Sequence, residues 1–100
     1  MSDRIYFCPP HMSGEEIKYI NESFESNWVS SVGKNIDEFE KQMCEYLGVK
    51  HATALVSGTA AIHLALKSFG VGHGDYVISS DFTFSGGCYP ILYQNANPIF

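Results

Sequence analysis

The stretch "ALVSGTAAIHLAL", residues 54–66, decides the fold: a short apolar run meets Ser57-Gly58-Thr59, and an apolar run with helical spacing follows at once. One explanation for these small polar residues is that Ser57 or Thr59 caps a helix while Gly58 makes the turn. The other is that the turn binds an anion, because a helix N-terminus presents unpaired N–H groups and about half a positive charge. Residues 57–60 alone leave both explanations open.

The composition is that of a globular protein. Hydrophobic residues make up 45% of the 100 residues and charged residues 17%, which excludes a disordered chain. The net charge of −5, without any basic run, argues against nucleic-acid binding. No apolar stretch approaches the roughly 20 residues of a membrane span, and no signal-peptide pattern is present. Cys8, Cys44 and Cys88 give neither a disulfide framework nor a zinc pattern. We therefore expect a cytoplasmic protein with reduced thiols.

Apolar spacing and turn signals predict alternating helices and strands. Ser13 and Glu16 form a capping-box pattern before a first helix, and residues 26–34 break its period. The later helices are expected from Asn35 to Gly48, over residues 60–69 and over 83–96, and the strands over 52–56, 76–80 and 98–100. Such alternation predicts an α/β fold with a parallel sheet. The helix at 60–69 is apolar nearly all round, so we expect it to be buried on more than one side.

A second candidate site follows the strand expected at 76–80. The carboxyl ends of parallel strands open on one rim of the sheet, so "DFTFSGG", residues 81–87, belongs to the same rim as the turn at residue 58. Phe82 and Phe84 point in different directions because they alternate. Either is most simply a core residue, yet an aromatic ring there can also stack on a flat ligand. A phosphate turn paired with an aromatic side chain suits a phosphorylated aromatic cofactor.

Five segments in register resemble one family. They are "PPHM" at 9–12, "SNWVSSVGKNIDEFEKQMCEYLGV" at 26–49, "SGTAAIHLAL" at 57–66, "GVGHGDYVISSDFTF" at 70–84 and "NANPIF" at 95–100. Together they resemble the DegT/DnrJ/EryC1/StrS group of pyridoxal-phosphate-dependent nucleotide-sugar aminotransferases, and "PPHM" looks most like members acting on UDP-linked 4-keto-6-deoxy sugars. The resemblance implies the N-terminal part of the large domain of pyridoxal-phosphate fold type I, in a longer homodimeric protein. It divides the chain into a lead-in, helix and substrate loop at 1–34 and the start of the cofactor domain at 35–100.

The resemblance also implies roles for individual residues. The amides of Gly58, Thr59 and Ala60 would hold the cofactor phosphate, and Phe84 would stack on the pyridine ring. On the substrate side, the loop residues Trp28, Val29 and Ser30 match a segment near the substrate and the dimer interface, and His11 lies in a lead-in that approaches the substrate. This sequence departs from relatives at Asp81 and at Ser85-Gly86-Gly87, where an Ala-Ser or Ala-Thr type of sequence commonly follows the aromatic residue.

The catalytic lysine of this family is expected beyond residue 100. Lys34, Lys41, Lys50 and Lys67 do not match its position and are expected on the surface, so residues 1–100 alone should be inactive. In the complete enzyme, the amino group would pass from an amino acid, expected to be glutamate, to a nucleotide-linked keto sugar. The alternatives are a sugar dehydratase with histidine in place of the lysine, a non-catalytic regulatory or binding protein, and an unrelated phosphate-binding domain.

Three further features are not assigned a chemical role. His63 comes one helical turn after the phosphate turn and is expected to pack against a neighbouring group, although it could face the cofactor. Cys88 lies near the sheet rim, but nothing near it in the sequence would lower its pKa. The residues "NANPIF" predict a turn and a strand start, so we expect the chain to be the front of a longer protein.

Overall fold

The computed structural model describes Arg4 and residues 8–100 of the chain. These residues form two compact units, which divide after Thr53, and each is described by itself. The division expected after residue 34 separates a substrate loop from a cofactor domain, and it stays a prediction. Among the described residues, no helix combines the length and apolar composition needed to cross a membrane.

The first unit contains two helices, α1 (Glu16–Glu25) and α2 (Lys34–Leu47). Part of the predicted capping box precedes α1: the Glu16 carboxylate accepts hydrogen bonds from the Ser13 N–H at 2.6 Å and the Ser13 hydroxyl at 2.9 Å. The Ser13 hydroxyl itself accepts from the N–H of Glu15 at 3.2 Å. Because this hydroxyl accepts from residue 15 rather than 16, the helix begins at Glu16, later than the predicted cap.

Glycines bound α2 at both ends. Gly33 precedes it with a φ of 143°, and Gly48 follows it with a φ of 67° in the left-handed region. Residues with a side chain rarely adopt these angles, so both positions favour glycine. The predicted C-cap at Gly48 is therefore confirmed. The Asn35 amide donates to the carbonyl of Tyr19 at 3.3 Å and to the hydroxyl of Ser23 at 3.0 Å, which ties the start of α2 to α1.

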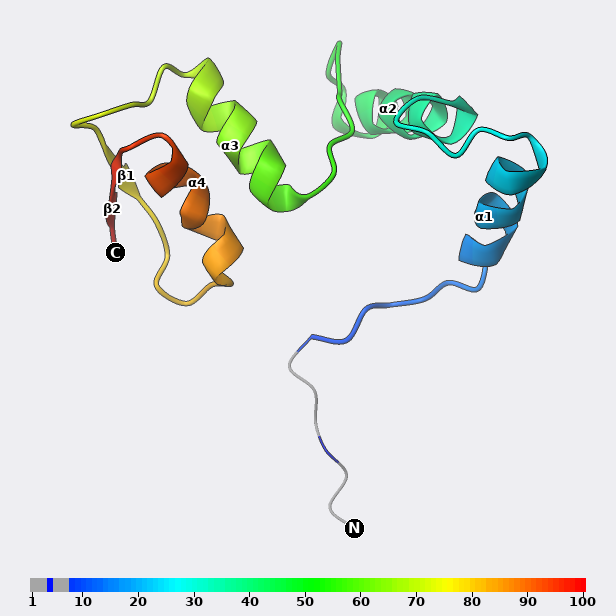
Figure 1. The fold of residues 1–100 in the computed structure, drawn as a ribbon, viewed down its shortest axis with the longest axis horizontal. Coiled ribbons are helices and arrows are strands. Elements are labelled where there is room, and N and C mark those ends of the chain that lie inside the picture. Colours follow the sequence, from blue (N-terminus) through cyan, green and yellow to red (C-terminus); the bar gives the residue numbers. More distant parts are fainter. Residues whose placement is uncertain (1–3, 5–7) are drawn as a thin grey trace. The chain divides into compact units, whose positions relative to one another are not determined.

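The second unit contains α3 (Gly58–Ser68), β1 (Tyr76–Ile78), the short 3₁₀ helix η1 (Ser85–Gly87), α4 (Tyr89–Tyr93) and β2 (Asn97–Ile99). Strands β1 and β2 pair in parallel with Val77 opposite Pro98, and they lie side by side in Figure 1. Pro98 lacks a backbone N–H to donate, so the pairing uses the N–H of Asn97, which donates to the carbonyl of Asp75 at 2.9 Å. The expected parallel pairing is confirmed.

The core of the second unit is small and surrounds α4. Pro90 is fully buried, and the exposed fractions of Ile91 and Ala96 are 2% and 4%. Helix α3 packs beside α4 through an edge-to-face contact between the rings of His63 and Tyr93, whose centroids are 5.4 Å apart. The expectation that His63 packs against a neighbour is thus confirmed.

Three expectations about the second unit are wrong. Residues 52–56 form no strand, because a strand needs a hydrogen-bonded neighbour and the described chain pairs β1 only with β2. Helix α3 has no buried residue, since α4 and η1 cover one of its faces while its other apolar side chains stay exposed. The helix expected over 83–96 is split into η1 and α4, because Pro90 belongs in a first helical turn.

We predict that Glu16 titrates far below an ordinary glutamate. Hydrogen bonds from the Ser13 N–H, from the backbone N–H of Glu16 itself and from the Ser13 hydroxyl lower its pKa from 4.5 to about 2. A lowered folded-state pKa means that the stabilisation is fully present above about pH 4.5 and is lost as the pH falls through about 2. Carbon-13 NMR of the side-chain carboxyl group would measure this directly. In Ser13→Ala the pKa should rise only part of the way to 4.5, because the backbone N–H remains; an unchanged pKa would contradict the role of the hydroxyl.

Candidate functional site

The first turn of α3 is capped by Ser57. Its backbone is extended, with a φ of −162°, and its hydroxyl oxygen accepts a hydrogen bond from the N–H of Ala60 at 3.1 Å. The N–H of Ala61 donates to the Ser57 carbonyl at 3.0 Å. Ser57 is therefore the N-cap, as the simpler explanation of this turn requires.

Capping by Ser57 does not exclude anion binding. Within the described part of the chain, the N–H groups of Gly58 and Thr59 donate to no acceptor. Gly58 is exposed and Thr59 half-buried. Two free amides, the positive end of the helix dipole and two hydroxyls are thus available to one anion. The Ala60 amide, predicted as a third donor, is held by Ser57 in this structure, and its contact with a phosphate stays a prediction.

The predicted aromatic residue lies against this same turn. Gly86 in η1 is buried, and a Cβ atom added to it would lie 2.7 Å from the Thr59 hydroxyl oxygen and 2.7 Å from Cε1 of Phe84. A Cβ atom at residue 86 would thus be flanked by the edge of the Phe84 ring and by the Thr59 hydroxyl. The ring itself is 82% exposed. The fold thus brings together the phosphate turn and the aromatic side chain that the sequence paired.

Phe82 is 84% exposed, so neither phenylalanine is a core residue of the second unit. This excludes for the described chain the explanation that both rings are packing residues. Sequence reasoning singled out Gly86 only for its departure from relatives. The signal that could have found it is a glycine two positions after an exposed aromatic residue at a strand end.

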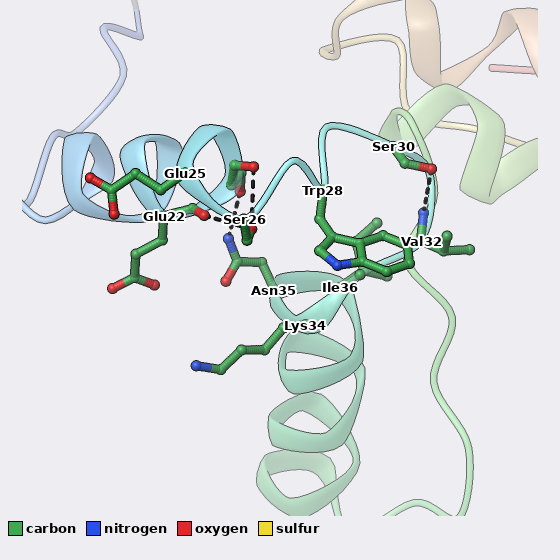
Figure 2. A pocket seen from close by; sticks show the side chains of 11 residues that line it. Glu22, Glu25, Ser26, Trp28, Ser30, Val32, Lys34, Asn35 and Ile36 are labelled. Carbon is green, nitrogen blue, oxygen red and sulfur yellow. Dashed lines mark hydrogen bonds between the residues drawn. The ribbon is translucent and has the colours of Figure 1, made fainter.

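A separate pocket lies in the first unit, between the end of α1 and the start of α2. Its volume is about 400 Å³, and Figure 2 shows the side chains that line it. Trp28 and Ser30 are among these residues, whereas Val29 and His11 are not. Gly33 supports the indole: a Cβ atom at residue 33 would lie 3.5 Å from the Cβ of Trp28. Of the four predicted substrate residues, two thus line one pocket. Lys34 and Asn35, which also line it, were predicted only as a surface lysine and a helix start.

Other candidate chemistry is sparse in the described residues. They contain no group of three or more His, Cys, Asp or Glu side chains that could hold a metal ion. Cys8, Cys44 and Cys88 are free thiols, and the Cys88 sulfur lies 3.4 Å from the hydroxyl of Ser79. The chemistry of the second unit therefore rests on the α3 turn and Phe84.

The profile of the DegT/DnrJ/EryC1/StrS aminotransferase family matches residues 10–100. The chain belongs to this family. EpsN of Bacillus subtilis (strain 168), assigned as a pyridoxal phosphate-dependent aminotransferase, is 51% identical over all of this chain and 26% of its own length. GDP-perosamine synthase of Vibrio cholerae is 45% identical over 91% of this chain and 25% of its own length.

Solved structures of the family share the fold. Spr1654 of Streptococcus pneumoniae, assigned as a sugar aminotransferase and solved in its PLP form, matches 95% of this chain and 24% of its own, with a TM-score of 0.81 and 32% identity. An aminotransferase from Psychrobacter cryohalolentis matches with a TM-score of 0.80 and 30% identity over 95% of this chain and 25% of its own. The chain thus spans about a quarter of the length of the relatives it matches.

The aminotransferases of this family depend on pyridoxal phosphate, and the residues present here fit that group. The free amides of Gly58 and Thr59 suit its phosphate, and the exposed ring of Phe84 suits its flat pyridine. The two features lie on either side of Gly86, which leaves space that a side chain would fill.

We predict that Gly58→Val weakens cofactor binding by the full-length protein more than it weakens the fold. A Cβ atom at residue 58 meets nothing within 4 Å, so only an approaching ligand would be obstructed. The loss should be about tenfold or more, because a hydrogen bond to a charged group contributes about 1.5–3 kcal/mol. Titration with pyridoxal phosphate measures the affinity and thermal unfolding the stability. Gly58→Ala is the milder control, and unchanged affinity in Gly58→Val would contradict the site.

Proposed function

We propose that this chain forms the N-terminal, cofactor-binding part of an aminotransferase that uses pyridoxal phosphate to transfer an amino group to a nucleotide-linked 4-keto-6-deoxy sugar. The observation that carries the proposal is that Phe84 and Thr59 both lie close to Gly86, which puts a flat apolar surface near an anion-binding helix turn. Membership of the family supports the reaction class.

In this proposal the second unit binds and orients the cofactor. The N–H groups of Gly58 and Thr59 donate to its phosphate, with the hydroxyls of Ser57 and Thr59 as further donors. One face of the Phe84 ring covers the pyridine and excludes water from that side. The cofactor, when bound, supplies the electron sink for the transfer. The lysine that carries the cofactor is proposed to lie beyond residue 100, and none of Lys34, Lys41, Lys50 and Lys67 is assigned that role.

The substrate is proposed from the first unit and from the relatives. The pocket around Trp28 and Ser30 offers an indole and hydroxyls to a sugar or a nucleotide base. Val29 and His11 stay proposed substrate contacts. Because neither lines this pocket, their contact with the substrate would depend on other parts of the protein. Relatives named GDP-perosamine synthase, which are 45% and 44% identical to this chain, support a sugar nucleotide, and glutamate is proposed as the donor. A cytoplasmic homodimer is proposed on the family resemblance.

The test of this function uses the full-length protein. It should bind pyridoxal phosphate with a visible absorption band, and with glutamate it should aminate a UDP- or GDP-linked 4-keto-6-deoxy sugar while releasing 2-oxoglutarate. Loss of water from the sugar without amino transfer would instead support the dehydratase. Absence of both cofactor binding and sugar chemistry would contradict the proposal.

We predict that Phe84→Ala weakens cofactor binding by roughly 1–3 kcal/mol, or about 5- to 150-fold, as stacking contacts between aromatic side chains and flat rings do. Phe82→Ala is the matched control, because both rings are similarly exposed, at 82% and 84%. The measurement is a fluorescence or absorbance titration with pyridoxal phosphate in the full-length protein. If Phe82→Ala caused the larger loss, the assignment of the stacking ring would be reversed.

A further inference from the structure

Gly86 is enclosed more tightly than any other glycine in the described chain. Its added Cβ atom would lie 2.7 Å from the Thr59 hydroxyl oxygen, 2.7 Å from Cε1 and 2.9 Å from Cδ1 of Phe84. All three distances are below the closest approach that side-chain carbon atoms make. The hydrogen atom of Gly86 therefore occupies the gap between a residue of the α3 turn and the proposed stacking ring.

The need for glycine at this position is spatial rather than conformational. The φ angle of Gly86 lies outside the left-handed region, unlike those of Gly33 and Gly48, so its backbone would accept a side chain. The adjacent Gly87 has room for a side chain. Its added Cβ atom would lie 3.5 Å from the Thr83 hydroxyl oxygen, an ordinary contact. Two neighbouring glycines of one 3₁₀ helix thus differ in what a methyl group would meet and in burial, since Gly86 is buried and Gly87 half-buried.

A methyl group at residue 86 would displace the Phe84 ring and crowd the Thr59 hydroxyl, each 2.7 Å from its position. Gly86 itself is buried, whereas the Phe84 side chain is 82% exposed. Few contacts hold an exposed ring, so it can turn about its side-chain bonds at little cost, and the buried backbone need not move. The turned ring would no longer lie at the same angle and distance from the first turn of α3. A substitution here should therefore act on binding more than on folding.

We propose that Gly86 is a positioning residue of the cofactor site: its missing side chain leaves room for the Phe84 ring to lie near the Thr59 hydroxyl, so that one ligand reaches both the ring and the helix turn. This inference rests on the proposed function, because it takes pyridoxal phosphate as that ligand. It concerns a residue that itself donates no group to the cofactor.

The test compares Gly86→Ala with Gly87→Ala in the full-length protein. Titration with pyridoxal phosphate should give a dissociation constant on the order of fivefold to tenfold higher for Gly86→Ala, because part of the stacking contact is lost. Gly87→Ala should bind like the unsubstituted protein. Both variants should keep its thermal unfolding temperature. Equal affinities of the two variants, or an unfolding temperature lowered in Gly86→Ala alone, would overturn the positioning role.

A double substitution identifies the ring as the group through which Gly86 acts. In a Phe84→Ala background no ring is left to displace, so adding Gly86→Ala should cost clearly less affinity than it costs the unsubstituted protein, with only the approach to the Thr59 hydroxyl remaining. The same fivefold to tenfold loss in that background would mean that residue 86 acts without Phe84, and would overturn the inference. If the unsubstituted protein did not bind pyridoxal phosphate, the proposed function would fail first, and this inference with it. If the protein bound pyridoxal phosphate but Gly86→Ala left the affinity unchanged, the role of Gly86 would be wrong while the proposed function would stand.

Discussion

The close approach of η1 to the first turn of α3 is the contact on which the candidate site depends. Thr59 and Phe84 lie far apart in the sequence and come from different elements, yet both face the buried Gly86. The segment that carries Gly86 is held by the small core around Pro90, Ile91 and Ala96. That core links α4 to η1 and β2, so the backbone that carries the Phe84 ring depends on several elements of the second unit.

The two proposed binding sites lie in different units but share one local arrangement. In each, a glycine lets an aromatic side chain lie against the start of a helix: Gly86 with Phe84 at α3, and Gly33 with Trp28 at α2. Helix starts offer unpaired N–H groups and a positive dipole end to polar ligands, while the aromatic ring covers a flat apolar one. A cofactor or sugar nucleotide that combines phosphate with a flat ring matches this pairing.

Caps and glycine stops could be predicted from neighbouring residues, whereas most features that depend on distant segments could not. The glycine stop at Gly48 was correct, and the cap, left open between Ser57 and Thr59, is Ser57. The parallel pairing joins distant segments and was predicted from the alternation of helices and strands. The strand at 52–56 and the burial of α3 depend on partners elsewhere, and the described residues supply neither. The helix at 83–96 was wrong because apolar spacing outweighed the break that Pro90 imposes.

The candidate site shows the same contrast between features set by neighbouring residues and features set by distant segments. The turn at Gly58 was singled out by its local pattern and Phe84 by the family resemblance, and their binding roles stay predictions. Gly86 was not singled out, because its closeness to both Thr59 and Phe84 exists only in three dimensions. Val29 and Trp28 are neighbours in one loop, yet only Trp28 lines the pocket, because the direction of a loop side chain depends on the turn that Gly33 makes.

The central claim is that the free amides of Gly58 and Thr59 bind the phosphate of the cofactor. Amide hydrogen exchange of residues 57–61 in the full-length protein tests it most directly, with pyridoxal phosphate and with pyridoxal, which lacks the phosphate. The account predicts that exchange of the Gly58 and Thr59 amides slows with pyridoxal phosphate and stays fast with pyridoxal at equal occupancy. Equal protection by both ligands, or by neither, would contradict it.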